Sequence, residues 1–78
     1  MKIKFGDPVE VIWEDACGSS SWRAPYDEGV IVTNVGLFVK QTRKGLCIAT
    51  GLDKDDKEWV LGPSYIPAAM VRKIRRLR

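Results

Sequence analysis

Glycine and proline recur at short intervals along the whole chain, and they constrain the fold more than any other feature. Both disfavour the interior of a helix, proline because it lacks an N–H and glycine because it loses the most conformational entropy. No stretch between them shows a helical stripe of ordinary length, so short strands fit the intervals better. These glycine and proline residues are Gly6, Pro8, Gly18, Pro25, Gly29, Gly36, Gly45, Gly51, Gly62, Pro63 and Pro67.

The residues between these breaks predict four strands and a closing element. In VEVIWED, residues 9–15, apolar and polar residues alternate, with Val9, Val11 and Trp13 on one face. Trp13 is therefore expected in the core, where its indole N–H needs an acceptor. Turns are expected at 43–45 and 53–56. The expected strands are residues 9–15, 29–42, 46–52 and 57–62, and residues 66–74 are expected to form a short turn and a closing strand.

The strand expected at 29–42 is long, and it is apolar on both faces. A strand of this length usually bends, and Asn34 and Gly36 offer a place for a bulge with positive φ. A small barrel buries only one face of such a strand. We therefore expect the other face to contact a second copy of the chain in a homo-oligomer.

These elements predict an all-β fold: a small five-stranded, strongly bent barrel, Sm-like or SH3-like, with at most one short helical turn. With 78 residues, the chain is long enough for a single domain, residues 1–78. The expected core residues are Val11, Trp13, Val30, Val32, Leu37, Val39, Ile48, Val60, Val71 and Ile74.

The net charge of +3 comes from the C-terminal end of the sequence. Residues 69–78 hold five of the 13 basic residues and no acidic one, so the rest of the chain is slightly acidic. Any electrostatic attraction to nucleic acid is thus expected at this basic end, residues 72–78. The candidate binding residues there are Arg72, Lys73, Arg75, Arg76 and Arg78.

The composition gives no sign of catalysis. The chain has no histidine, the commonest general base and metal ligand. Cys17 and Cys47 make no zinc site without histidine partners, and DKDDKE lacks the spacing of a calcium loop and fits a solvated hairpin turn. We expect no enzyme activity, no metal and no cofactor. Without a secretory signal or a membrane span, a cytoplasmic location with both thiols free is expected.

The loop expected at residues 16–27 contains CGSSSW and a second aromatic residue. In one interpretation Trp22 caps the open end of the barrel. In the other, Trp22 and Tyr26 stack on a planar ligand while Arg23 and the serines bind its polar edge. Cys17 follows two acidic residues, which raise the pKa of a thiol and disfavour a reactive nucleophile.

WEDA at 13–16, Trp22, VTNVGLFVKQT at 32–42, LCIATGLDKDD at 46–56 and IPAAMVRKIRRL at 66–77 form a pattern. This pattern, over most of residues 9–77, resembles a group of short uncharacterised proteins of tailed bacteriophages. The group is similar in outline to Sm-like and SH3-like barrels, although this chain lacks the Sm base-reading loop. The resemblance implies a phage or prophage accessory protein in the bacterial cytoplasm, and it implies no activity.

Three functions remain open. The first is binding of nucleic acid, RNA in particular, by an oligomer through the basic end with help from the loop aromatics. The second is a phage protein that binds a host protein or sequesters a small nucleotide at a subunit interface. The third is a minor structural or chaperone-like role.

Overall fold

The computed structural model describes residues 2–15 and 29–77, and these form an all-β fold. Seven strands and one short 3-10 turn account for most of them. The elements are β1 (Pro8–Asp15), β2 (Val30–Gln41), β3 (Gly45–Ala49), β4 (Gly51–Leu52), β5 (Val60–Leu61), β6 (Ser64–Pro67), η1 (Ala68–Met70) and β7 (Val71–Arg76).

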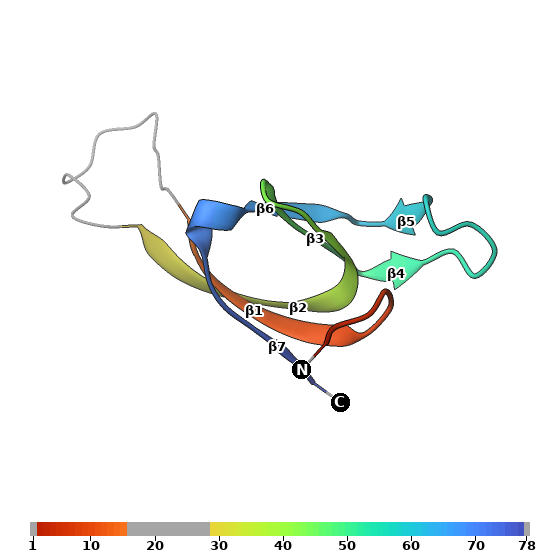
Figure 1. Cartoon of the computed structure of the whole chain (residues 1–78), viewed down its shortest axis with the longest axis horizontal. Coiled ribbons are helices and arrows are strands. Elements are labelled where there is room, and N and C mark those ends of the chain that lie inside the picture. Colours follow the sequence, from red (N-terminus) through yellow and green to blue (C-terminus); the bar gives the residue numbers. More distant parts are fainter. Residues whose placement is uncertain (1, 16–28, 78) are drawn as a thin grey trace.

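Five strands form one antiparallel sheet in the order β6-β3-β2-β1-β7, and β4 and β5 form a small hairpin beyond it. The sheet curls, so that β3 and β6 lie across from β1 and β2, while the β4–β5 hairpin projects away (Figure 1). The turn η1 connects the two edge strands, β6 and β7. No backbone pairing joins these two edges among the described residues.

Most of the predicted strands are confirmed. Residues 8–15 and 30–41 are strands, and a short turn does precede a closing strand at 71–76. The strand predicted at 57–62 is shorter than expected, because only Val60 and Leu61 pair, and the strand predicted at 46–52 is divided into β3 and β4. The carbonyl of Asp56 accepts the N–H of Trp59, which keeps the preceding residues in the turn. Gly62 then adopts a φ of 58° and separates β5 from β6, a strand that the sequence had not revealed.

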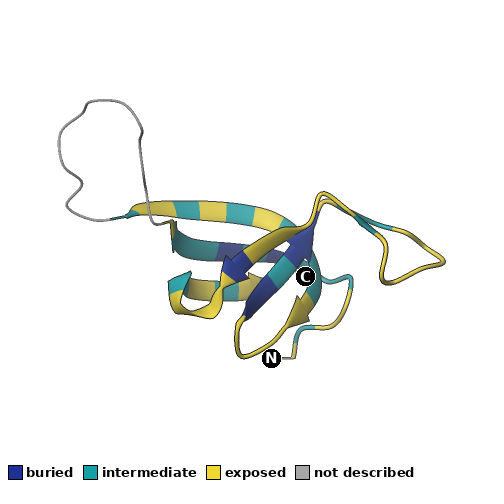
Figure 2. Cartoon of the chain, turned by 90° about the horizontal axis from the view of Figure 1, so that it is seen from above, coloured by how far each residue is buried: buried dark blue, intermediate teal, exposed yellow. Residues whose placement is uncertain are grey.

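The core lies between the two halves of the curled sheet. The fully buried side chains belong to β1, β3 and β6. Figure 2 colours the buried residues dark blue. Of the ten expected core residues, Val11 and Ile48 are buried, and Trp13, Val71 and Ile74 pack against them half-buried. The buried hydrophobic residues are Val9, Val11, Leu46, Ile48, Ala49 and Ile66.

The bulge expected at Asn34 and Gly36 is absent. β1 and β2 pair without a shift from Pro8 opposite Leu37 to Asp15 opposite Val30, and the irregularity falls between Phe38 and Lys40. Alternation therefore continues through Gly36, so Phe38 packs against the core. Val30, an expected core residue, is 52% exposed.

Gly36 has a different role. A Cβ atom at this position would lie 3.0 Å from the carbonyl oxygen of Ala49 and 3.2 Å from the Cδ1 of Ile48. Glycine thus permits the close approach of β2 to β3.

Candidate functional site

The predicted basic end is a structural strand. β7 pairs with β1 along its length, with Ile74 opposite Val11 and Arg75 opposite Glu10. The N–H of Leu77 continues this pairing with a 2.9 Å hydrogen bond to the carbonyl of Pro8. Residues 71–77 are therefore part of the sheet, while Arg78 lies outside the described residues.

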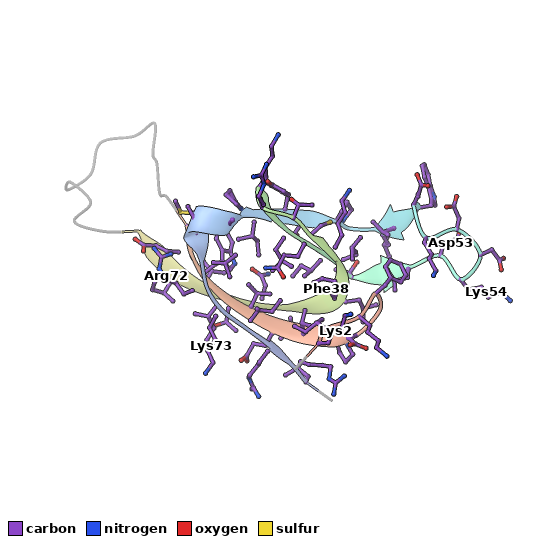
Figure 3. All side chains as sticks on the ribbon, viewed as in Figure 1. Lys2, Phe38, Asp53, Lys54, Arg72 and Lys73 are labelled. Carbon is purple, nitrogen blue, oxygen red and sulfur yellow. The ribbon has the colours of Figure 1, made fainter. Side chains whose placement is uncertain are left out.

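Three of the four described basic residues at this end form ion pairs with carboxylates, two on β1 and one just before it. Arg72 lies 2.5 Å from Glu14, and the Nε of Arg75 donates to Glu10 across 2.8 Å. Arg76 forms a longer pair with Asp7, at 3.7 Å. Lys73 pairs with no carboxylate among residues 2–15 and 29–77, and its side chain points outward from the sheet (Figure 3). The carboxylates oppose phosphate binding at this end because they repel an anion.

Glu14 is the residue whose titration this arrangement changes. The guanidinium of Arg72 donates to its Oε1, and the N–H of Gly29 donates to its Oε2 across 3.2 Å. These hydrogen bonds, first that of Arg72 and then that of Gly29, lower the pKa of Glu14 below its ordinary value. Glu14 is therefore held in its charged form.

The loop candidates cannot be placed in this arrangement. Trp22, Arg23 and Tyr26, together with Cys17, lie outside the described residues. Whether Trp22 caps the core or stacks on a ligand stays a prediction.

A second group of basic residues lies at the end of β2 and in the β2–β3 turn, where the carbonyl of Lys44 accepts the N–H of Ala68 in η1. Lys40 is near the end of β2, and Arg43 and Lys44 form the tight turn that leads into β3. All three residues are exposed, and the sequence from residue 29 to residue 52 contains no acidic residue. Unlike the arginines of β7, these cations have no acidic residue near them in the sequence.

An exposed aromatic ring lies next to this turn. In the sheet register Lys40 faces Cys47 and Cys47 faces Tyr65, so the three form one row across β2, β3 and β6. A Cβ atom on Gly45 would lie 2.5 Å from the Cζ of Tyr65, so the ring rests on the backbone of this glycine. Tyr65 is nevertheless 60% exposed. We refer to Lys40, Arg43, Lys44 and Tyr65 as the hairpin face.

A hollow adjoins the hairpin face through Lys40 and the half-buried free thiol of Cys47. It has a volume of about 410 Å³. The ammonium of Lys57 lies 5.5 Å from the centre of the Phe5 ring, a cation–π contact at its wall. Its lining is Phe5, Val39, Lys40, Cys47, Lys57, Glu58 and Val60.

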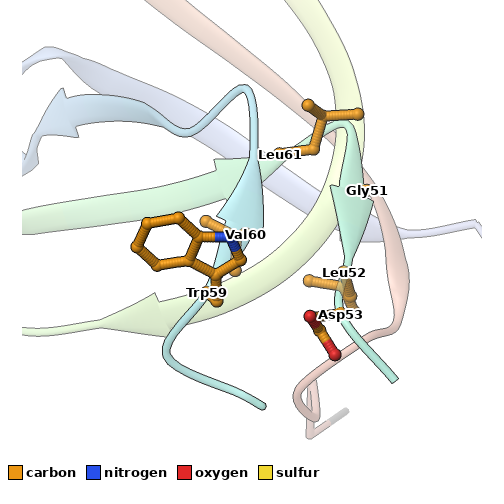
Figure 4. A pocket seen from close by; sticks show the side chains of 6 residues that line it. All are labelled: Gly51, Leu52, Asp53, Trp59, Val60 and Leu61. Carbon is orange, nitrogen blue, oxygen red and sulfur yellow. The ribbon is translucent and has the colours of Figure 1, made fainter. Parts of the chain in front are cut away.

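A second hollow, of about 270 Å³, lies on the β4–β5 hairpin (Figure 4). Trp59 and Leu61 line it and are 73% and 70% exposed. The adjoining turn, residues 53–58, has four acidic residues and two lysines, so it disfavours an anionic ligand.

The same turn confirms the hairpin interpretation of DKDDKE. The Oδ1 of Asp53 accepts the N–H groups of Asp55 and Asp56, and the Oδ1 of Asp56 accepts that of Glu58. These carboxylates thus stabilise the turn between β4 and β5. No group of three or more potential metal ligands occurs in the part of the chain that the structure describes.

Sequence reasoning missed the hairpin face. Its signal was the absence of acidic residues from residue 29 to residue 52, whereas the proximity of Tyr65 required the β3–β6 register. Comparisons with known proteins add no candidate, since no family model, curated protein or solved structure matches the chain. Among the described residues, no helix has the length and apolar character that a membrane crossing needs.

Proposed function

We propose that the protein is a non-catalytic small β-barrel module that binds single-stranded nucleic acid, RNA in particular, on its hairpin face. The curled five-stranded sheet, with η1 between its edge strands, supports an SH3-like or Sm-like barrel. The resemblance to short phage proteins supports an accessory role for a phage or prophage in the bacterial cytoplasm.

The observation that carries the nucleic-acid proposal is the exposed ring of Tyr65 beside three cations. Aromatic rings that stack on bases and basic groups that contact the backbone are the two elements of single-strand binding. Lys40, Arg43 and Lys44 supply the positive charge, and Phe5 and Lys57 extend the surface along the adjoining hollow. The site therefore differs from the basic end, where Glu10 and Glu14 neutralise Arg75 and Arg72.

A second candidate is supported by the hollow on the β4–β5 hairpin. Its exposed Trp59 and Leu61 are suited to the apolar side chains of a host protein, and aromatic residues of this kind are frequent in the centres of interfaces. Exposed apolar side chains on β2 likewise support the homo-oligomer that the sequence predicts.

Fluorescence anisotropy with a labelled single-stranded RNA tests the first proposal. The triple variant Lys40→Gln, Arg43→Gln, Lys44→Gln should bind more weakly than the wild type. Its affinity should also fall less steeply with salt, by about 0.7 in the log–log slope for each phosphate that the variant no longer neutralises. The matched control is Arg72→Gln with Arg75→Gln, which removes exposed cations that already pair with carboxylates and should change the slope little.

Tyr65 is tested in the same assay. Tyr65→Ala should weaken binding by about 1–3 kcal/mol if the ring stacks on a base, whereas Tyr65→Phe should retain most of the affinity. A wild-type protein without RNA binding at low salt would contradict the proposal and favour the host-protein candidate. If only the Arg72→Gln, Arg75→Gln variant changed the salt dependence of RNA affinity, the binding site would lie at the basic end and not on the hairpin face.

A further inference from the structure

β2 has neighbours on both sides over only part of its length. β1 pairs with residues 30–37 of β2, but β3 begins to pair only at Leu37. Among the described residues, no strand pairs with residues 30–36 on the side away from β1. Within the part of the chain that the structure describes, the first half of β2 is thus an edge strand.

The backbone groups that face this free edge follow from the register. Phe38 directs its N–H to the carbonyl of Asp7 and accepts the N–H of Gly6, both at 2.8 Å, so its backbone faces the β1 side. Pairing with β1 runs without a shift back to Val30. Successive residues of a strand direct their polar groups to opposite sides. Ile31, Thr33 and Val35 therefore present their N–H and C=O groups to the free edge.

This edge lacks the features that keep sheet edges apart. Exposed edge strands usually carry lysine, proline or a bulge, which prevent pairing with another chain. Residues 29–39 contain no charged residue and no proline, and no bulge interrupts the pairing of residues 30–37 with β1. The side chains of Ile31 and Val35 are also 56% and 63% exposed. Among residues 2–15 and 29–77, nothing covers the backbone edge, and the apolar side chains along it are exposed.

We propose that a second copy of the chain pairs with this edge in antiparallel orientation, about a twofold axis at Thr33. In this register Ile31 lies opposite the partner's Val35, and Thr33 lies opposite its own copy. The symmetry also places Val35 opposite the partner's Ile31, so there are three opposed pairs. Each pair exchanges two backbone hydrogen bonds, about six in all, and these use the N–H and C=O groups that Ile31, Thr33 and Val35 present to the edge. The β-branched pairs on the outer face add side-chain contact across the junction.

The charges beside the edge permit this approach. On the same outer face, Glu10 pairs with Arg75 and Glu14 pairs with Arg72, so these charges largely cancel. Lys73 has no carboxylate partner among the described residues, but β1 separates it from Thr33. Two copies can therefore meet with little like-charge repulsion, because both copies of β1 and β2 separate the two Lys73 side chains and exposed charges this far apart are screened. This interface specifies the homo-oligomer of the proposed function, and it does not depend on nucleic-acid binding.

Charge substitutions at the twofold axis test the interface. Sedimentation equilibrium at about 10–500 µM protein should show a reversible wild-type dimer, because an interface of this limited extent is weak. Thr33→Lys places two like charges opposite each other only in the dimer, so this variant should be monomeric, and Thr33→Glu should behave in the same way. An equimolar mixture of the two variants should restore dimers, since lysine then faces glutamate.

The matched control is Gln41→Lys, which adds the same charge to β2 at an exposed position that β3 already pairs with. This variant should dimerise like the wild type. Restored dimers in the mixture also show that both Thr33 variants are folded. A monomeric wild type, a Thr33→Lys variant that dimerises as the wild type does, or a mixture that stays monomeric would each overturn the proposal.

Discussion

The indole Nε1 of Trp13 donates a hydrogen bond to the Oδ1 of Asn34 across 2.7 Å and so joins β1 to β2 through their side chains. Both residues are half-buried, and Trp13 packs against the core. Asn34 thus provides the acceptor that the sequence predicted for the indole. The side chain expected to form part of a bulge is instead a partner within a regular strand.

We expect Asn34→Ala to destabilise the fold by about 1–3 kcal/mol, because it leaves the indole N–H without its acceptor in a half-buried position. Urea unfolding followed by tryptophan fluorescence or circular dichroism measures the change. Trp13→Phe combined with Asn34→Ala should cost less than the sum of the two single substitutions, since both remove the same bond. If the two changes in the free energy of unfolding were additive, the Trp13–Asn34 hydrogen bond would make no contribution of its own to stability.

Two leucines of the β3–β6 region provide a matched pair for the core. Leu46 on β3 is completely buried, whereas Leu61 on β5 is 70% exposed. Leu46→Ala should cost about 2–5 kcal/mol, because it removes buried apolar surface and leaves a cavity. Leu61→Ala should stay within about 0.5 kcal/mol. Similar midpoints of thermal unfolding for the two variants would contradict the placement of the core.

Local patterns in the sequence were sufficient for much of the fold. The alternation in residues 9–15 predicted β1 and its inward residues Val11 and Trp13, and the β-branched run from residue 29 predicted β2. The inward residues of β2 were partly wrong because a bulge assumed near Gly36 exchanges the two faces of everything that follows. Phe38 and Leu37 were thereby assigned to the wrong sides. The burial of Leu46 and Ile66 depended on the β3–β6 pairing, which no local pattern revealed.

The role of the basic end was harder to predict from sequence, because its charges are balanced by residues distant in the chain. Arg72 and Glu14 are 58 positions apart, and Arg75 and Glu10 are 65 apart. The basic end therefore resembled an isolated cluster until the β1–β7 register placed the carboxylates beside it. The hairpin face needed the reverse inference, since its moderate charge matters only because Lys40, Arg43 and Lys44 form no ion pair within the described residues.

The pair of Glu14 and Arg72 predicts a pH dependence of stability. The pKa of Glu14 is lowered in the folded chain, chiefly by the hydrogen bond from Arg72, so the unfolded chain binds a proton more readily. The stabilisation is therefore complete above the unfolded-state pKa and is lost as the pH falls through the lower, folded-state pKa, from about pH 5 downward. Glu14→Gln should accordingly be less stable than the wild type at neutral pH, by a small margin because the pair is exposed. The difference in urea midpoint should shrink as the pH falls. Glu58→Gln, on the β4–β5 turn away from β7, controls for the general loss of one negative charge. A Glu14→Gln difference that is constant from pH 7 to acid would contradict the role of this carboxylate.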